Sequence, residues 1–122
     1  MNYYGIPSLS NIYLEDSYVL SVREAEGSLV FELEAVLTEN HPKYKKPQEG
    51  EMYCYRKILL RFLNVDYFEW LDRSFAVYAD ASGDFDYGNI DSFVCCGGGY
   101  KLAGDWGRVA IKGGGVNVIV ED

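Results

Sequence analysis

Two adjacent cysteines before three glycines form the stretch of this chain that most looks like a chemical site. Cys95 and Cys96 precede Gly97, Gly98 and Gly99 in the sequence SFVCCGGGYKLAGDWG. A phosphate-binding loop needs a strand, a glycine-rich turn and then a helix whose start carries Lys followed by Ser or Thr. Neither this segment nor the later KGGGVNV has that signature. We therefore interpret the glycines as a tight turn between two strands, where glycine supplies positive backbone dihedrals.

The cysteines also lack the partners that reactive thiols and metal sites need. A nucleophilic cysteine requires a nearby base. The single histidine, His41, lies in a proline-rich loop that is distant in sequence from Cys95 and Cys96. A zinc site usually needs Cys-x-x-Cys pairs, which do not occur. Alternation along SFVCC sends Cys95 and Cys96 to opposite faces of a strand, so we expect one small core residue and one partly exposed thiol. We predict no catalytic residue, no metal and no cofactor.

An acidic stretch, DASGDFDYGNID over residues 80–91, has some of the spacing of a calcium-binding loop. Oxygen-bearing side chains fall at positions one, three, five, seven and twelve of that loop. However, Phe85 stands where the sharp turn requires glycine, and Asp91 replaces the longer glutamate at the end. We interpret the stretch as a solvated acidic turn.

Composition and charge limit the fold class, the binding partners and the cellular compartment that we expect for this protein. The 122 residues suit a single domain over residues 1–122, and 16% aromatic residues with 13 glycines favour strands and turns over helices. The net charge of -8 opposes binding to nucleic acid, because phosphates would be repelled. It suits a basic protein partner, although such a charge more often serves only to keep a cytoplasmic protein soluble. No segment has the run of apolar residues that a membrane span needs. Three cysteines, an odd number, favour a reducing cytoplasm.

Apolar residues recur mostly with a period of two, which is typical of strands. Residues 17–24 and 28–38 are predicted to form a hairpin, and Leu29, Phe31 and Leu33 share the inner face of its second strand. Residues 39–51 are polar and carry two prolines, so we expect a solvated loop. A long strand should follow over residues 51–65.

The second half of the chain is predicted to contain one short helix and several more strands. Asp66 can cap a helical turn near residues 66–72, and alternation returns over residues 74–80. Beyond residue 88, four apolar runs separated by glycines indicate a meander of hairpins. We expect an all-β fold of about seven or eight antiparallel strands, arranged as a β-sandwich or a partly closed β-barrel.

Several strand patterns resemble those of a known group of proteins. YLEDSYVLSV before a Leu/Glu-alternating strand, LLRFLNV in mid-chain and WGRVAI before a Val-rich end are similar to a loose group of small, uncharacterised bacterial β-rich proteins. Some members of that group resemble the immunity proteins found beside polymorphic toxins. The resemblance implies a small cytoplasmic protein that acts by binding, and it implies no catalytic residue.

These observations predict a non-enzymatic protein-binding module, with an immunity protein that neutralises a basic toxin as its specific form. The candidate partner-binding residues are Asp84, Asp86, Tyr87 and Trp106, which lie near turns of the glycine-rich half, although a tryptophan such as Trp106 is more often buried in a core. Two alternatives stay open. One is a β-barrel whose tyrosine-lined mouth binds a small molecule, and the other is a structural domain that self-associates through an exposed strand edge.

Overall fold

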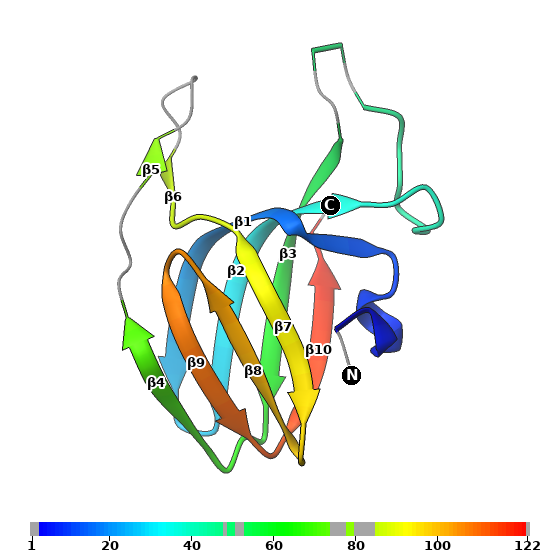
Figure 1. Cartoon of the computed structure of the whole chain (residues 1–122). Coiled ribbons are helices and arrows are strands. Elements are labelled where there is room, and N and C mark those ends of the chain that lie inside the picture. Colours follow the sequence, from blue (N-terminus) through cyan, green and yellow to red (C-terminus); the bar gives the residue numbers. More distant parts are fainter. Residues whose placement is uncertain (1–2, 48, 51–52, 74–77, 80–84, 122) are drawn as a thin grey trace.

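The fold is an antiparallel β-sandwich. The computed structural model describes residues 3–47, 49–50, 53–73, 78–79 and 85–121. Within these residues the chain forms ten strands, eight of which make two four-stranded sheets that pack against each other (Figure 1). This confirms the predicted all-β class. The two sheets do not close into a barrel over this part of the chain, so the sandwich alternative is the correct one.

The first sheet has the strand order β1-β2-β3-β10, and the second has the order β4-β9-β8-β7. The strands of the first sheet are β1 (Ile12–Ala25), β2 (Ser28–Leu37), β3 (Cys54–Leu63) and β10 (Gly115–Val120). The strands of the second sheet are β4 (Tyr67–Arg73), β7 (Ile90–Cys96), β8 (Gly99–Gly104) and β9 (Gly107–Lys112). A separate two-stranded ribbon pairs β5 (Tyr78–Ala79) with β6 (Phe85–Asp86).

The core lies between the two sheets and follows the alternation of the sequence. Leu29, Phe31 and Leu33 of β2 are fully buried, as the pattern predicts. Phe62 of β3 and Trp106, at the turn between β8 and β9, complete an aromatic centre in which Phe31 meets each of them edge-on. Burying a large apolar side chain contributes about 1.5–3 kcal/mol, so this filled interior supplies much of the stability.

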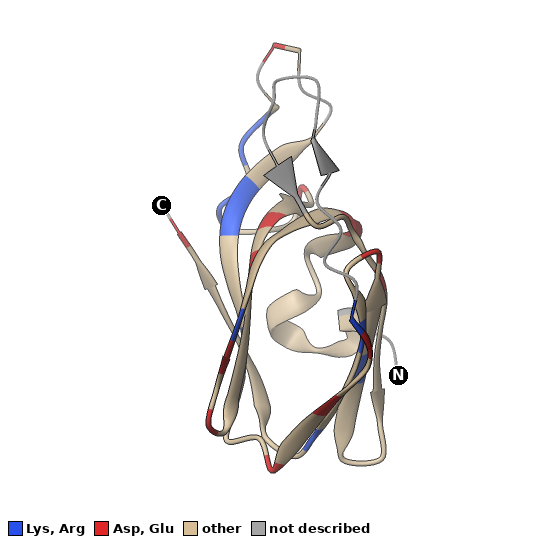
Figure 2. Cartoon of the chain, turned by 90° about the vertical axis from the view of Figure 1, so that its left-hand side faces the viewer, with Lys and Arg blue, Asp and Glu red and all other residues tan. Residues whose placement is uncertain are grey.

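The N-terminal segment covers one open side of the sandwich. Two short 3-10 turns, Tyr3–Gly5 and Pro7–Leu9, lie between the sheets beside β7 and β10, as Figure 2 shows. Leu9 is fully buried, and the hydroxyl of the buried Tyr3 donates to Glu15 Oε2 at 2.8 Å. No helix in the described residues is long and apolar enough to span a membrane.

The hairpin, the loop and the long strand of the first half are confirmed. The chain turns from β1 to β2 at residues 26–27, and residues 38–47 contain no strand. β3 occupies the region expected for the long strand. The strand expected over residues 74–80 lies largely outside the described residues, apart from its two positions in β5.

The short helix expected near residues 66–72 is wrong, because this segment is strand β4. Phe68 and Trp70 are half-buried and alternate with the exposed Tyr67 and Glu69, which is the two-residue period of a strand. β4 pairs with β9 along its length. The cross-strand contacts with β9 therefore outweigh the local capping signal of Asp66.

The glycine-rich end is only partly a meander. β7, β8 and β9 are joined by hairpins, but β10 crosses to the first sheet and pairs with β3. The turn after the two cysteines is confirmed, since Cys96 pairs with Gly99 and both Gly97 and Gly98 have positive φ, +48° and +83°. Cys95 is half-buried and Cys96 is exposed, so neither is the core residue that we expected.

Candidate functional site: a tyrosine-lined groove

The residues chosen from the sequence do not form one surface in the described part of the chain. Trp106 is fully buried, and its indole N–H donates to the carbonyl of Asn89 at 3.0 Å, so it is a core residue. Tyr87 is half-buried, and its backbone N–H donates to the carbonyl of Val19. Asp84 lies outside the described residues, and Asp86 is placed only as part of the backbone of β6.

A bulge in β1 builds a different site. Tyr13 pairs with Val36 and Tyr18 pairs with Glu34, so the four β1 residues between these tyrosines stand opposite the single residue Ala35. The hydroxyl of the fully buried Ser17 accepts the backbone N–H of Val36 at 3.0 Å and donates to the carbonyl of Tyr13 at 2.7 Å. Ser17 thereby satisfies backbone groups that the interrupted ladder would leave unpaired.

The bulge brings Tyr13 and Tyr18 of β1 to the outer face of the first sheet, beside Tyr55 of β3 and Tyr53, which immediately precedes β3. Val36 of β2 pairs with Tyr13 on one side and with Tyr55 on the other, so these three residues form one row across the sheet. The Tyr18 ring stacks on Tyr55 at a centroid distance of 6.1 Å, and Tyr53 meets Tyr55 edge-on at 6.0 Å. We call Tyr13, Tyr18, Tyr53 and Tyr55 the tyrosine patch.

Hydrogen bonds hold the patch in one arrangement. The hydroxyl of Tyr53 bonds to the Asp16 carboxylate, which raises the pKa of that phenol because its ionised form would face a negative charge. Burial, followed by the neighbouring Tyr18, raises the pKa of Tyr55 to about 12. Both phenols therefore remain neutral hydrogen-bonding groups at physiological pH.

The loop after β2 contributes a fifth tyrosine. His41 Nδ1 accepts the backbone N–H of Lys43 at 3.0 Å, and the carbonyl of His41 accepts the N–H of Tyr44 at 3.0 Å. The N–H of Lys45 points to Cys54 Sγ at 3.5 Å, which ties the loop to β3. Burial, together with Lys43 and Arg56, lowers the pKa of His41, so the imidazole stays an acceptor at neutral pH.

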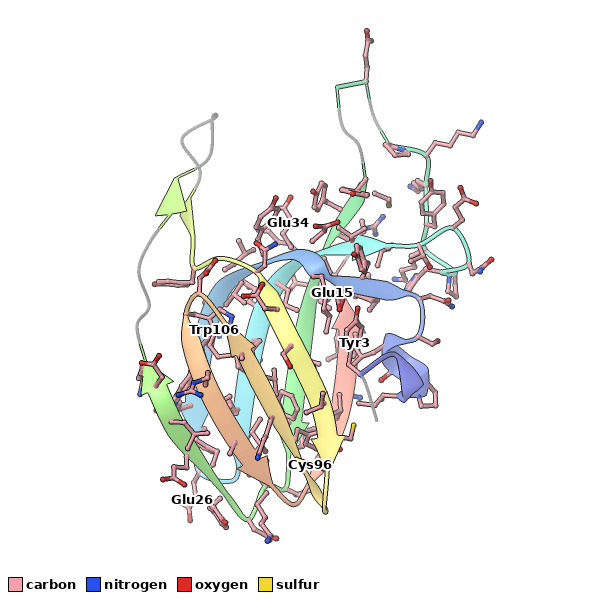
Figure 3. The ribbon with its side chains drawn as sticks, viewed as in Figure 1. Tyr3, Glu15, Glu26, Glu34, Cys96 and Trp106 are labelled. Carbon is pink, nitrogen blue, oxygen red and sulfur yellow. The ribbon has the colours of Figure 1, made fainter. Side chains whose placement is uncertain are left out.

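Between the loop and the sheet lies a groove of about 310 Å³. It is lined by Tyr13, Val36, Leu37, Thr38, Glu39, Tyr44, Pro47, Tyr53 and Cys54. Tyr13 is 43% exposed at its rim. Figure 3 shows Glu34, the β2 partner of Tyr18, at this upper end of the sandwich, whereas Glu26 lies at the lower end. Figure 2 shows basic residues on the loop and on the adjoining start of β3.

The side chains of this groove can bind a partner through apolar contacts and hydrogen bonds. Its aromatic and aliphatic walls offer apolar contact, while phenol hydroxyls and the carboxylates of Asp16 and Glu39 offer hydrogen bonds at the rim. In the part of the chain that the structure describes, no group of three or more His, Cys, Asp or Glu side chains is placed to hold a metal ion.

The sequence pattern does not predict the tyrosine patch. Tyr18 follows Tyr13 by five positions, an odd offset that places the two side chains on opposite faces of a regular strand. Tyr53 and Tyr55, two residues apart, fall on one face of the long strand predicted over residues 51–65, but the pattern does not connect them with Tyr13 or Tyr18.

The fold and the groove together define an antiparallel β-sandwich with a tyrosine-lined surface site. Comparison of the chain with protein-family models, with curated proteins and with solved structures finds no match.

Proposed function

We propose that this chain is a non-enzymatic protein-binding module and that the tyrosine patch and its groove are the contact surface. The observation that carries the proposal is the ordering of the tyrosine patch around Val36 by stacking and hydrogen bonds. Tyrosine gives a large contact area at little cost in conformational entropy, and the cost falls further when the ring is already held in place.

The partner that we propose is a basic protein. The net charge of -8 would speed the encounter with a cationic surface. Glu39 lines the groove and Asp16 bonds to Tyr53, so both carboxylates are placed where rim ion pairs would form. The resemblance to immunity proteins leads us to propose one basic partner in particular, a toxin that this chain would neutralise in a bacterial cytoplasm.

A binding experiment with matched variants tests the proposal. The immobilised chain is exposed to extract of the source cells and, separately, to the purified product of the adjacent reading frame. We expect the wild type to retain a protein at moderate salt and the Tyr13→Ser/Tyr53→Ser double variant to retain at least about tenfold less, because tyrosine is enriched among the few interface residues whose truncation costs about 2 kcal/mol or more. Tyr67→Ser, which alters a tyrosine 57% exposed on β4, serves as the control and should bind normally.

Two results would contradict the proposal. One is a wild-type chain that retains no protein in either arm, and the other is a double variant that retains the same protein as strongly as the wild type. If only Tyr67→Ser lost binding, the contact surface would lie on β4 and not at the tyrosine patch.

A small-molecule site is the second candidate, and the size of the groove favours it. About 310 Å³ lies at the lower end of the range for ligand pockets. Native mass spectrometry of the chain purified from its source cells would support this candidate if a small bound mass disappears in the Tyr13→Ser/Tyr53→Ser variant. An unliganded mass would count against it.

A further inference from the structure

Strand β10 forms one edge of the first sheet and has β3 on only one side (Figure 1). The backbone N–H of Glu121 donates to the carbonyl of Lys57 at 2.9 Å, just beyond the last pair of the β10 ladder. Because bonding alternates along an antiparallel pair, the odd-numbered residues of β10 bond to β3 and Val116, Val118 and Val120 direct their N–H and C=O groups outward. Within the described residues, no backbone bond from another segment reaches these three valines.

The other three edge strands are protected against pairing with another chain. β1 has two register shifts, and its Val19 exchanges backbone hydrogen bonds with residues 87–88. β4 has a register shift and carries the charged Asp72 and Arg73, and β7 has a register shift beside Asp91. Bulges and charges of this kind are the usual means of blocking a sheet edge.

β10 has none of these features. Its sequence, GVNVIV, contains no charged residue and no proline, and its register with β3 is unbroken from Gly115 to Val120. Ile119 is 39% exposed on the outer face, while the three valines pack toward the core. The Pro7–Leu9 turn lies near this strand but leaves its outward backbone groups without a partner in the described residues.

We infer that β10 pairs antiparallel with β10 of a second copy of this chain, which joins the two first sheets into one continuous eight-stranded sheet. A two-fold axis at Val118 places Val116 opposite Val120 of the second copy and uses the outward groups of all three valines. The same register puts Ile119 opposite Asn117 of the second copy.

Charge also favours this antiparallel arrangement. In the register centred on Val118, Glu121 lies beside Gly115 of the second copy, so the two Glu121 carboxylates are six residues apart, or about 20 Å. A parallel arrangement would put them side by side in a protein whose net charge is already -8. A second copy is therefore an occupant that this uncharged edge can accept.

Sedimentation equilibrium across a wide range of concentrations tests the inference. We expect the average mass of the wild type to rise from 13.8 kDa toward twice that value. Ile119→Lys should weaken dimerisation at least about tenfold, because the two new lysines become diagonal neighbours across the axis. Val118→Pro should do the same by removing an outward N–H without breaking a bond to β3.

Leu71→Lys is the matched control, since it makes the same kind of change at a 51% exposed position of β4, and it should dimerise like the wild type. If a β10 variant fails to fold, hydrogen exchange of the wild type still decides the question. The amides of residues 116, 118 and 120 should exchange more slowly as the concentration rises. A mass that stays at 13.8 kDa, or a dimer that Leu71→Lys disrupts and Ile119→Lys does not, would overturn the inference.

Discussion

Ser17 Oγ lies 2.7 Å from the carbonyl oxygen of Tyr13, four residues earlier on the same strand, and also accepts the N–H of Val36 on the neighbouring strand. One buried hydroxyl thus closes the bulge in β1. The bulge in turn places Tyr13 and Tyr18 on the same face of the sheet, so this hydroxyl supports the geometry of the tyrosine patch.

Replacing Ser17 with Ala should lower the free energy of unfolding by about 1–3 kcal/mol, because the buried N–H of Val36 loses its partner and the part-buried carbonyl of Tyr13 loses one as well. Ser92→Ala, at an exposed position of β7, should change it by less than about 0.5 kcal/mol. Urea denaturation of both variants measures the difference. Equal stabilities would mean that the bulge does not depend on the hydroxyl.

The strands with regular alternation could be predicted from the sequence, and the irregular ones could not. In β2 the inner face is occupied by Leu29, Phe31 and Leu33, as the pattern indicates. In β1 a second register shift, between Val19 and Ser21, interrupts the alternation that we expected over residues 17–24. A bulge depends on tertiary hydrogen bonds, so the local pattern carries little sign of it.

The same limit explains the errors in the second half of the chain. β4 looked helical because the pattern of a short segment does not distinguish a helical turn from a strand that has only one neighbour. The crossing of β10 to the first sheet depends on its partner β3, which is distant in sequence. Tryptophan is highly buried on average in proteins, and Trp106 follows this tendency because it is fully buried.

Gly104 should tolerate no side chain, because a Cβ there would lie 2.1 Å from the carbonyl oxygen of Asn89 and 2.5 Å from the indole nitrogen of Trp106. We expect Gly104→Ala to destabilise the fold by about 1–3 kcal/mol through this overlap. The tryptophan fluorescence should change as well, since the bond from Trp106 to Asn89 is displaced. Gly115→Ala, where a Cβ meets nothing within 4 Å, is the control, and its stability should stay within about 1 kcal/mol of the wild type.

The loop that carries Tyr44 should respond to acid. The pKa of His41 is lowered from its ordinary value of 6.5 by burial and by nearby cations, so the unfolded chain binds this proton more readily than the folded chain does. The contribution to stability is therefore present above pH 6.5 and is lost as the pH falls through the lower folded value. A protonated Nδ1 can no longer accept the N–H of Lys43.

An NMR titration measures this effect directly. The His41 imidazole should titrate below pH 6.5, and the amide signals of Lys43 and Tyr44 should move with the same midpoint. A midpoint above 6.5, or amide signals that stay fixed while the imidazole titrates, would show that His41 does not hold the loop.

Calorimetric titration of the chain with the protein that it retains from the source cells shows whether the tyrosine patch is the binding surface. We expect Tyr13→Ser/Tyr53→Ser to weaken binding by at least about tenfold, or about 1.4 kcal/mol, while Tyr67→Ser and Ile119→Lys bind like the wild type. Equal affinity of the double variant and the wild type would contradict the proposal.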